Sequence, residues 1–307
     1  MGSTKALLFA GVVALGAATG ARAADLPLPP QYVPPPEVVD FGGWYLRGDV
    51  GVGVASNPNI RSTFYDQSYA PIDTATAVPS FARDQQHIAD SSFVDIGVGY
   101  QVNNWLRFDA TGEYRTDQHF STIESYDAGA GFGVPGTGRG YDQYNGSLQS
   151  SVFLVNAYAD LGTWYGLTPF IGAGVGAAYN RVTSLSDLGV GGPTIVDQAG
   201  NVFNGVGNGG FGFAKEHDKF NLAYAAMAGV SYSVSQNLKL ELGYRYLNMG
   251  DATSGFINCV NSTGCVIEKH RYDLASQDIR LGMRWMISDV APTPVYYPPE
   301  APIVRKY

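Results

Sequence analysis

The chain has 307 residues and is acidic, with 27 Asp and Glu against 19 Lys and Arg, a formal net charge of −8. This balance argues against nucleic acid as a partner. Charged residues make up 15% of the chain, below the roughly 25% usual for soluble domains. The 39 glycines and 20 tyrosines suit strands and turns better than helices.

The first 23 residues have the pattern of a secretory signal peptide. Lys5 precedes an apolar run at 6–18, and residues 21–23, Ala-Arg-Ala, form a small-x-small cleavage site. Cleavage there removes Lys5 and Arg22, which changes the formal charge from −8 to −10. The apolar run is short for a membrane span, and no later segment offers about 20 uninterrupted apolar residues. An exported chain of this kind is secreted, periplasmic or an outer-membrane barrel.

Strict alternation of apolar and polar residues recurs along the mature chain. Residues 237–248, NLKLELGYRYLN, separate completely into an apolar and a polar face, and a period of two indicates a strand. Such a strand fits a soluble sheet or, with the apolar face toward lipid, an outer-membrane barrel. Eight segments of about ten residues, the length that crosses an outer membrane, carry strand periodicity. They are 44–54, 93–102, 106–115, 152–161, 169–179, 222–234, 238–247 and 278–285.

The connections between these segments alternate in length. Residues 103–105, 162–168 and 235–237 are short, whereas four connections run to about thirty residues or more, the asymmetry between periplasmic turns and extracellular loops of an outer-membrane barrel. We predict an all-β fold: an eight-stranded antiparallel transmembrane β-barrel at 43–286 with long extracellular loops. An even strand number places both termini in the periplasm, with a proline-rich tether at 24–42 and a proline-rich tail at 287–307.

Aromatic residues are sorted between the two ends of the predicted strands. All four tryptophans fall at the proposed periplasmic rim, and four tyrosines fall at the opposite strand ends, as expected for the two interfacial girdles of a barrel. The predicted girdle consists of Trp44, Trp105, Trp164, Trp285, Tyr114, Tyr179, Tyr224 and Tyr246.

The same alternation assigns fourteen charged residues to the inside of the barrel, seven of each sign. The interior of an eight-stranded barrel is just wide enough for side chains, so balanced charge there favours a packed ion-pair network over an open pore. A narrow conductance through gaps in the network is the alternative. The predicted lumen residues are Arg47, Asp49, Asp95, Arg107, Asp109, Glu113, Arg115, Asp160, Lys239, Glu241, Arg245, Asp278, Arg280 and Arg284.

Two cysteines, Cys259 and Cys265, are separated by five residues in an exported chain, which predicts a small loop disulfide; a pair of free thiols is the alternative. With only His270 nearby they fall short of the four ligands of a structural zinc site. We expect no metal and no cofactor.

Two motifs imitate active sites. Gly172, Gly174 and Ala177 resemble a dinucleotide fingerprint, but no helical pattern follows them. His119 and Ser121 have the spacing of the His-x-Ser pair of lipid A deacylases, in which an imidazole activates a serine. Because the pair begins a polar loop, we expect a solvated histidine and no enzyme. We place every histidine in or beside a predicted loop: His87, His119, His217 and His270.

Three strand sequences also resemble a known family. FGGWYLRGDVGVG, ELGYRYLNMGD and DIRLGMRWMI, together with the signal peptide and the proline-rich lead, resemble the opacity-protein-like surface antigens of alphaproteobacterial outer membranes, which are OmpA-like transmembrane barrels. The resemblance implies an abundant outer-membrane barrel with roles in envelope integrity or surface contact and without a catalytic centre. Such barrels commonly end on an aromatic residue, whereas here Trp285 and Met286 precede a tail.

The leading functional hypothesis is a structural surface protein in contact with outer-membrane lipid and lipopolysaccharide. The alternative is a small porin-like channel for small solutes. Related barrels can carry an amino-terminal Ala-Asp that is cross-linked to peptidoglycan, and Ala24-Asp25 matches that dipeptide. An ordinary remnant of signal-peptide cleavage is the competing interpretation of these two residues.

Overall fold

The computed structural model describes residues 42–56, 59–130, 133–189, 194–204, 210–260 and 266–287. The predicted signal peptide at 1–23 lies outside these ranges, as do all but the margins of the two proline-rich tails. These three segments therefore stay predictions. The first described strand, β1, is Gly43–Ala55, and the last, β15, is Ile267–Met286.

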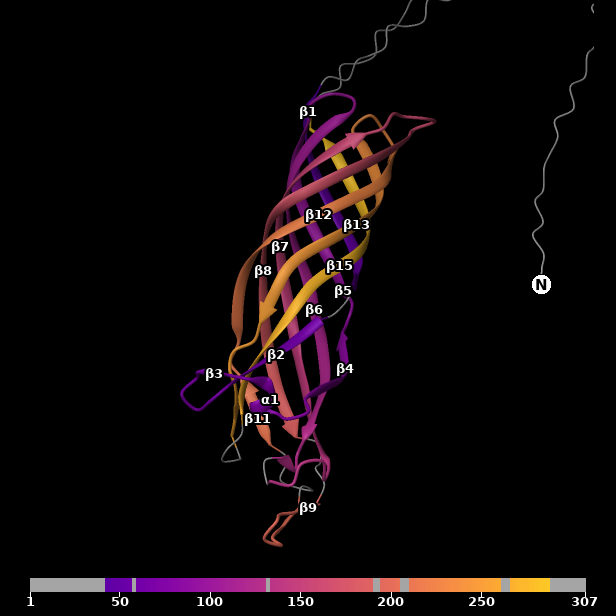
Figure 1. Ribbon diagram of the computed structural model, residues 1–307. Coiled ribbons are helices and arrows are strands. Elements are labelled where there is room, and N and C mark those ends of the chain that lie inside the picture. The colour runs from indigo at the N-terminus through magenta and orange to yellow at the C-terminus, as the bar shows by residue number, and fades with distance from the viewer. Residues whose placement is uncertain are drawn as a thin grey trace, which may run out of the picture. The chain divides into compact units, whose positions relative to one another are not determined.

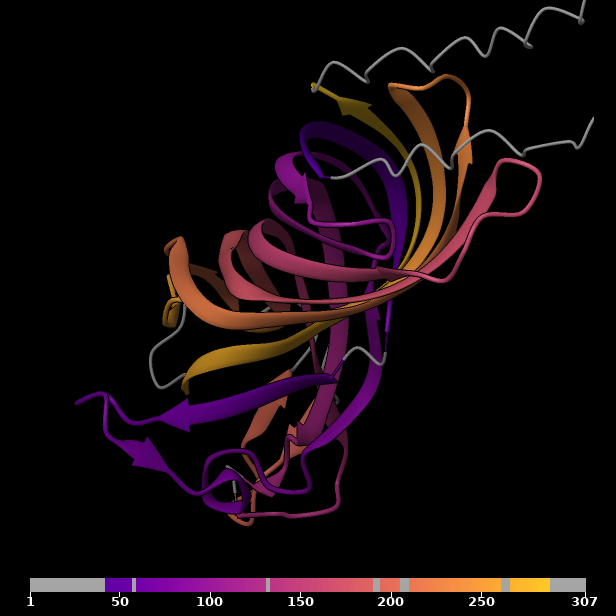
Figure 2. The ribbon, with the colours of Figure 1, turned by 90° about the horizontal axis from the view of Figure 1, so that it is seen from above.

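Eight antiparallel strands form a closed ring (Figures 1 and 2). Each strand pairs with the next, and β15 returns to pair with β1, from Tyr45 opposite Met286 to Ala55 opposite Ser276. All eight predicted strands and the barrel architecture are confirmed. In ring order the strands are β1, β5 (Ser91–Gln101), β6 (Leu106–Asp127), β7 (Arg139–Asp160), β8 (Leu167–Gly189), β12 (His217–Ser233), β13 (Leu238–Thr253) and β15.

The barrel is apolar outside and charged inside over one half of its length. On β13, Leu240, Leu242 and Tyr244 are between 42% and 54% exposed, while Glu241 and Arg245 are at most 3% exposed. A water-soluble sheet has the opposite arrangement. We call the end with the three short connections the turn end and the opposite end the loop end.

The apolar outer band stops partway along the strands. Beyond it, outward positions carry charge: Asp117 follows the exposed Tyr114 on β6, Arg181 on β8 pairs with Asp218 on β12, and Asp273 lies on β15. A tilted strand crosses the apolar band of about 25 Å with roughly ten residues. The longer strands therefore continue well past the membrane at the loop end.

The expectation of four long loops is wrong in one respect, because much of their length is sheet. β6 and β7 stay paired up to Asp127 and Arg139, so only residues 128–138 connect them. Beyond the band the alternation inverts, with polar side chains outward and apolar side chains inward. A prediction from sequence that requires an apolar outer face therefore ends each strand too early.

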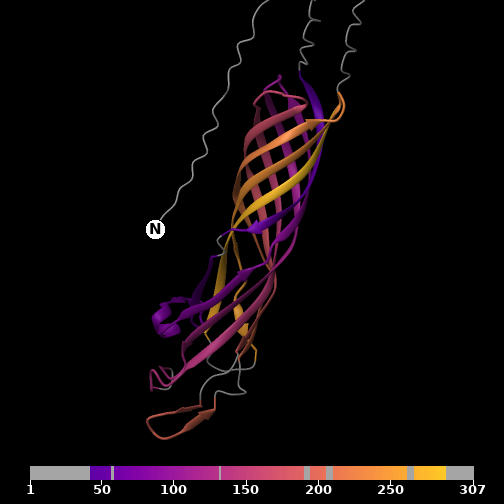
Figure 3. The ribbon, with the colours of Figure 1, turned by 90° about the vertical axis from the view of Figure 1, so that its right-hand side faces the viewer.

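Short strands complete the wall at the loop end. β2 (Asn59–Tyr65) pairs with β15, and β4 (Ala82–Ile88) pairs with β6. On the other side β11 (Phe211–Ala214) bridges β8 to β14 (Ile257–Cys259), which pairs with β15. The remaining elements at this end are β3 (Pro71–Ile72), α1 (Thr74–Ala77) and the hairpin of β9 (Thr194–Val196) and β10 (Val202–Asn204) (Figure 3).

Inside the loop end lies an apolar core. Its side chains come from strands all around the barrel. Many are fully buried, because the outward positions at this end are polar and apolar side chains avoid water by pointing into the interior. Among the described residues, no helix has the length and apolar character to span a membrane. The core includes Ile60, Leu148, Val182, Leu185, Leu247, Met249, Ile257 and Tyr272.

Candidate functional site

The structure places thirteen of the fourteen predicted lumen residues in the barrel interior, each at most 6% exposed. The fourteenth, Lys239, lies opposite the inward-facing Arg284 in the sheet but is only half-buried near the turn end of β13. The thirteen side chains separate into two groups of ion pairs. We call them the central cluster, around Arg47, and the Asp278 cluster, which lies closer to the loop end.

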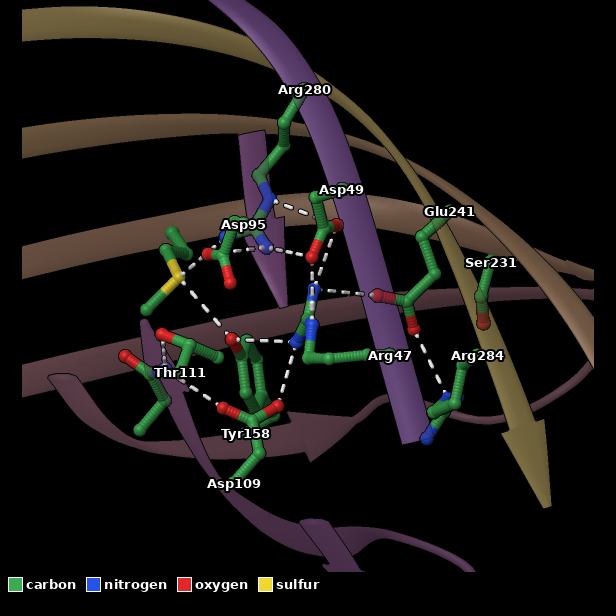
Figure 4. Close-up of polar contacts among 12 residues, drawn as sticks. Arg47, Asp49, Asp95, Asp109, Thr111, Tyr158, Ser231, Glu241, Arg280 and Arg284 are labelled. Atoms are coloured by element: carbon green, nitrogen blue, oxygen red, sulfur yellow. Dashed lines mark hydrogen bonds and ion pairs between the residues drawn. The ribbon is translucent and has the colours of Figure 1, made fainter. Parts of the chain in front are cut away.

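Arg47 on β1 organises the central cluster (Figure 4). Its guanidinium donates to both oxygens of Asp49, at 2.9 and 3.0 Å, and to Asp109 Oδ2 at 2.6 Å. It also lies 3.3 Å from Glu241 Oε2 on β13, so it joins strands on different sides of the ring. Arg280 approaches Asp49 Oδ2 at 2.7 Å from β15.

Glu241 connects three arginines. Besides Arg47, it forms ion pairs through Oε1 with Arg107 at 3.4 Å and with Arg284 at 3.2 Å. Arg107 further pairs with Asp160 at 3.2 Å. A carboxylate and guanidinium groups removed from water need several partners each to offset the loss of hydration, and Glu241 meets that condition.

The Asp278 cluster is compact. Asp278, fully buried, lies between Arg115 at 2.6 Å and Arg245 at 2.6 Å. Glu113 closes the square, 2.8 Å from Arg115 and 2.5 Å from Arg245. Both guanidinium groups stack on the Phe93 ring at about 5 Å. Two cations and two anions are therefore neutral together.

Inward glycines make room for these side chains. Gly282 lies between Asp49 and Glu241 in the sheet, and a Cβ there would come within 2.0 Å of Asp49 Oδ1. Gly172 and Gly174, part of the apparent dinucleotide fingerprint, lie in β8, where Tyr158 and Asn156 occupy the corresponding space. Their small size serves packing of the interior.

The central cluster has one carboxylate in excess. Four arginines face five carboxylates, and Asp95 is the one with little compensation: neither oxygen has a hydrogen-bond partner, and Arg280 is 3.8 Å away. Beside Arg47, Tyr158 and Arg280 is a cavity of about 10 Å³, room for about one water molecule. The interior is tightly filled but not uniformly paired.

A third charged group lies inside the loop end and was missed by the sequence analysis. The expectation that His270 belongs to a loop is wrong: it is fully buried in β15, near the buried Glu268 and, from β6, Glu124. Its Nε2 is 3.5 Å from Glu268 Oε2 and 3.9 Å from Glu124 Oε1. We call these three residues the His270 cluster.

Two more carboxylates face the His270 cluster. Burial raises the pKa of Asp187 on β8 to about 9, and the neighbouring Asp142, Glu268 and Glu124 add to the rise. Burial raises the pKa of Asp142 on β7 to about 7, again with help from Glu268 and Glu124. Both groups lie beyond the apolar band. Four carboxyl groups are therefore gathered inside the loop end, and burial keeps that of Asp187 protonated at neutral pH.

The raised pKa of Asp187 predicts that the loop end loses stability as pH rises. Its folded pKa of about 9 exceeds the unfolded value of about 4, so folding favours the protonated acid. The stabilisation is complete below about pH 4 and is lost progressively up to about pH 9. Urea unfolding at pH 5, 7 and 9 measures it, and Asp187→Asn, which does not titrate, should flatten the slope. An unchanged slope in that variant would contradict this account.

The predicted girdle residues lie on the outer surface, with the four tryptophans between 52% and 58% exposed near the turn end. The expectation that the four tyrosines lie at the ends of their strands is wrong. Tyr114, for example, is followed by thirteen further residues of β6. The strands continue because pairing persists beyond the apolar band.

The remaining predicted site residues stand apart from the interior. His119 is exposed on β6, and its Nδ1 lies 2.9 Å from Ser147 Oγ on β7, so its hydroxyl partner is not the Ser121 of the His-x-Ser motif. Cys259 ends β14, while Cys265 lies outside the described residues, so their disulfide stays a prediction. Ala24 and Asp25 also lie outside them.

Comparison with known proteins agrees with the barrel. The Opacity family porin protein family matches residues 139–267. A protein of Brucella abortus is 32% identical over 251 residues, which cover 81% of this chain and 82% of that one. The chain belongs to the opacity-protein family of outer-membrane β-barrels. A putative adhesin of Rickettsia prowazekii is 23% identical over 80% of this chain and 87% of its own.

Two solved structures of outer-membrane proteins are similar to this chain in fold. Neisserial surface protein A is 18% identical, with a TM-score of 0.34, over 80% of this chain and 97% of its own. OprG of Pseudomonas aeruginosa is 13% identical, with a TM-score of 0.44, over 81% and 97%. By its family and its sequence relatives, the chain is an outer-membrane barrel with adhesin-like and porin-like homologues.

Proposed function

We propose that this barrel is a structural protein of the outer membrane that contributes to envelope integrity and presents its loop end for surface contact. The turn end would face the periplasm, together with both chain ends. The filled interior carries the proposal. The two ion-pair clusters occupy the half of the barrel that carries the apolar outer band, here called the membrane half. The apolar core around Leu247 and Tyr272 occupies the loop end.

The loop end offers a surface suited to contact with another molecule. Tyr65 and Tyr69 pack edge-on against Phe256 at 5.1 and 4.7 Å, and Lys269 Nζ lies 4.0 Å from the Phe256 ring centroid. Tyr69 is 49% exposed. Aromatic side chains are enriched in protein interfaces. The adhesin-like relatives support the same direction.

Conductance across a planar lipid bilayer tests the structural role. With the interior filled, the purified barrel is expected to give no unitary current steps, or steps far smaller than those of an open porin inserted in the same bilayer. The heat-modifiable gel shift, in which a folded barrel migrates differently from a boiled one, confirms that the inserted protein is folded. Steady porin-like current from folded protein would contradict the proposal.

The second candidate is a narrow channel for small solutes, and one observation favours it. Asp95 has two oxygens without hydrogen-bond partners in the membrane half, and the central cluster contains the water-sized cavity. Water or small ions passing the cluster would meet this charge. If a small current exists, Asp95→Asn should change its size or ion selectivity, and an unchanged current would exclude a path past Asp95.

We further infer that the protein is not an enzyme. The Ser147 hydroxyl that contacts His119 belongs to a residue only 8% exposed, which leaves little access for a substrate. Cells that carry His119→Ala are expected to make lipid A with unchanged acylation, as judged by mass spectrometry. An altered acyl pattern would revive a catalytic role.

The predicted partners on the membrane side are outer-membrane lipid and lipopolysaccharide, which the exposed apolar band suits. Peptidoglycan is proposed as a further partner through Ala24 and Asp25. Mass spectrometry of muramidase-digested cell walls tests this attachment. A stem peptide joined to a chain that begins at Ala24 would support it, and the absence of such a peptide in cells that express the protein would exclude it.

A further inference from the structure

The His270 cluster joins strands that lie on the two sides of a seam. At the loop end β2 pairs with β15, and β4 pairs with β6, but no ladder in the described part of the chain joins β2 to β4. Glu124 comes from β6, whereas Glu268 and His270 come from β15. The three side chains therefore meet across the gap that the two short strands leave open.

The ligand atoms of this cluster lie close together, and those of His270 and Glu268 are not hydrogen-bonded. All three side chains are at least nine-tenths buried, and their ligand atoms lie within 4.8 Å of one another. His270 Nε2 and Glu268 Oε2 have no hydrogen-bond partner. A buried polar atom without a hydrogen-bond partner costs free energy, because its lost hydration is not replaced by a bond within the protein. A group that fits between these atoms would remove that cost.

The orientation of the imidazole suits metal binding. His270 Nδ1 lies 3.4 Å from the Tyr272 hydroxyl, and the opposite ring nitrogen faces the two carboxylates. Metal-bound histidines commonly hold the second nitrogen in this way. Arg83 and Ser62 both donate to Glu124 Oε1, at 3.0 Å from Arg83 Nε and 2.8 Å from Ser62, and these bonds fix the orientation of that carboxylate.

Charge points to a cation as the missing group. Two buried acidic side chains, Glu124 and Glu268, face the imidazole of His270, and the carboxyl groups of Asp142 and Asp187 lie near them. Arg83 is the cation bonded to the cluster. Distances agree as well: tetrahedral zinc with bonds of about 2.0–2.1 Å places neighbouring ligand atoms about 3.3 Å apart. The separations of the two carboxylate oxygens from His270 Nε2 are 3.5 and 3.9 Å.

We propose that Glu124, Glu268 and His270 bind a divalent transition-metal ion, of which Zn²⁺ is the natural probe, and that the ion clips β6 to β15 across the seam. Imidazole with carboxylate ligands suits Zn²⁺ better than Mg²⁺ or Ca²⁺, which prefer oxygen ligands alone. The clip is independent of whether the barrel conducts, because it lies beyond the membrane half.

Titration of the folded, chelator-stripped mature chain with Zn²⁺ tests the site. Calorimetry should show one saturable site that is weakened at least about tenfold in Glu268→Gln and in His270→Gln. Glu216→Gln, which alters an exposed carboxylate paired with Arg181, should bind as the unchanged protein does. The gel shift verifies folding of every variant, and X-ray absorption at the zinc edge should show nitrogen and oxygen ligands without sulfur.

Two results would overturn the site. One is the absence of saturable binding to folded protein. The other is an affinity in both cluster variants that equals that of the unchanged protein, which would assign the zinc to surface histidines such as His87 or His119. Hydrogen exchange tests the clip itself: Zn²⁺ should slow exchange in β2 and β4 in the unchanged protein and not in His270→Gln. Exchange that zinc leaves unaltered despite binding would overturn the clip.

Discussion

Asp278→Asn is expected to lower the free energy of unfolding by about 3–5 kcal/mol, the cost of breaking a buried ion pair from one side. The substitution preserves the shape of the side chain but removes its charge. Arg115 and Arg245, both within 2.6 Å of Asp278 and almost fully buried, would then share the single charge of Glu113. Water cannot enter to compensate, because Phe93 covers both guanidinium groups.

A matched control lies on the same strand. Asp273 also pairs with an arginine, Arg61 at 2.5 Å, but the two side chains are 39% and 51% exposed. Asp273→Asn should therefore cost about 0–1 kcal/mol. Urea unfolding of the barrel in phospholipid vesicles measures both variants. Equal losses would mean that burial does not set the strength of the Asp278 cluster.

The membrane half of the barrel was predictable because lipid imposes a strict rule. A strand between lipid and lumen must alternate without exception, so the outward face of 238–247 is apolar and Glu241 and Arg245 face inward. Assigning the inward side required no knowledge of neighbours. Which partner each charge selects was not predictable, since Arg47 pairs both with Asp49 on its own strand and with Glu241 across the barrel.

The buried charged residues of the loop end were missed on both β15 and β6, but only on β6 does a physical feature of the strand hide them. On β15 the inward phase set by Asp278 continues through Tyr272 to His270, so extending that phase would have found the buried histidine. On β6 the same extension fails. A bulge between Arg115 and Gln118 shifts the register, and the inward side chains change from odd to even positions. Glu124 therefore could not be placed inside from sequence alone.

Leu242→Arg is expected to destabilise the barrel by about 2–4 kcal/mol, the cost of a cation facing lipid near the middle of the membrane. Leu242 is 54% exposed and lies between Leu281 and Val230 in the sheet, so the new side chain would have only apolar neighbours. Leu188→Arg is the control: Leu188 is 46% exposed, but it lies at the loop end of β8, beyond the apolar band. There the arginine reaches water, and the change should cost less than about 0.5 kcal/mol. Vesicle unfolding compares the two, and similar losses would show that the band ends elsewhere along the strands than the outward charges of Asp117 and Arg181 indicate.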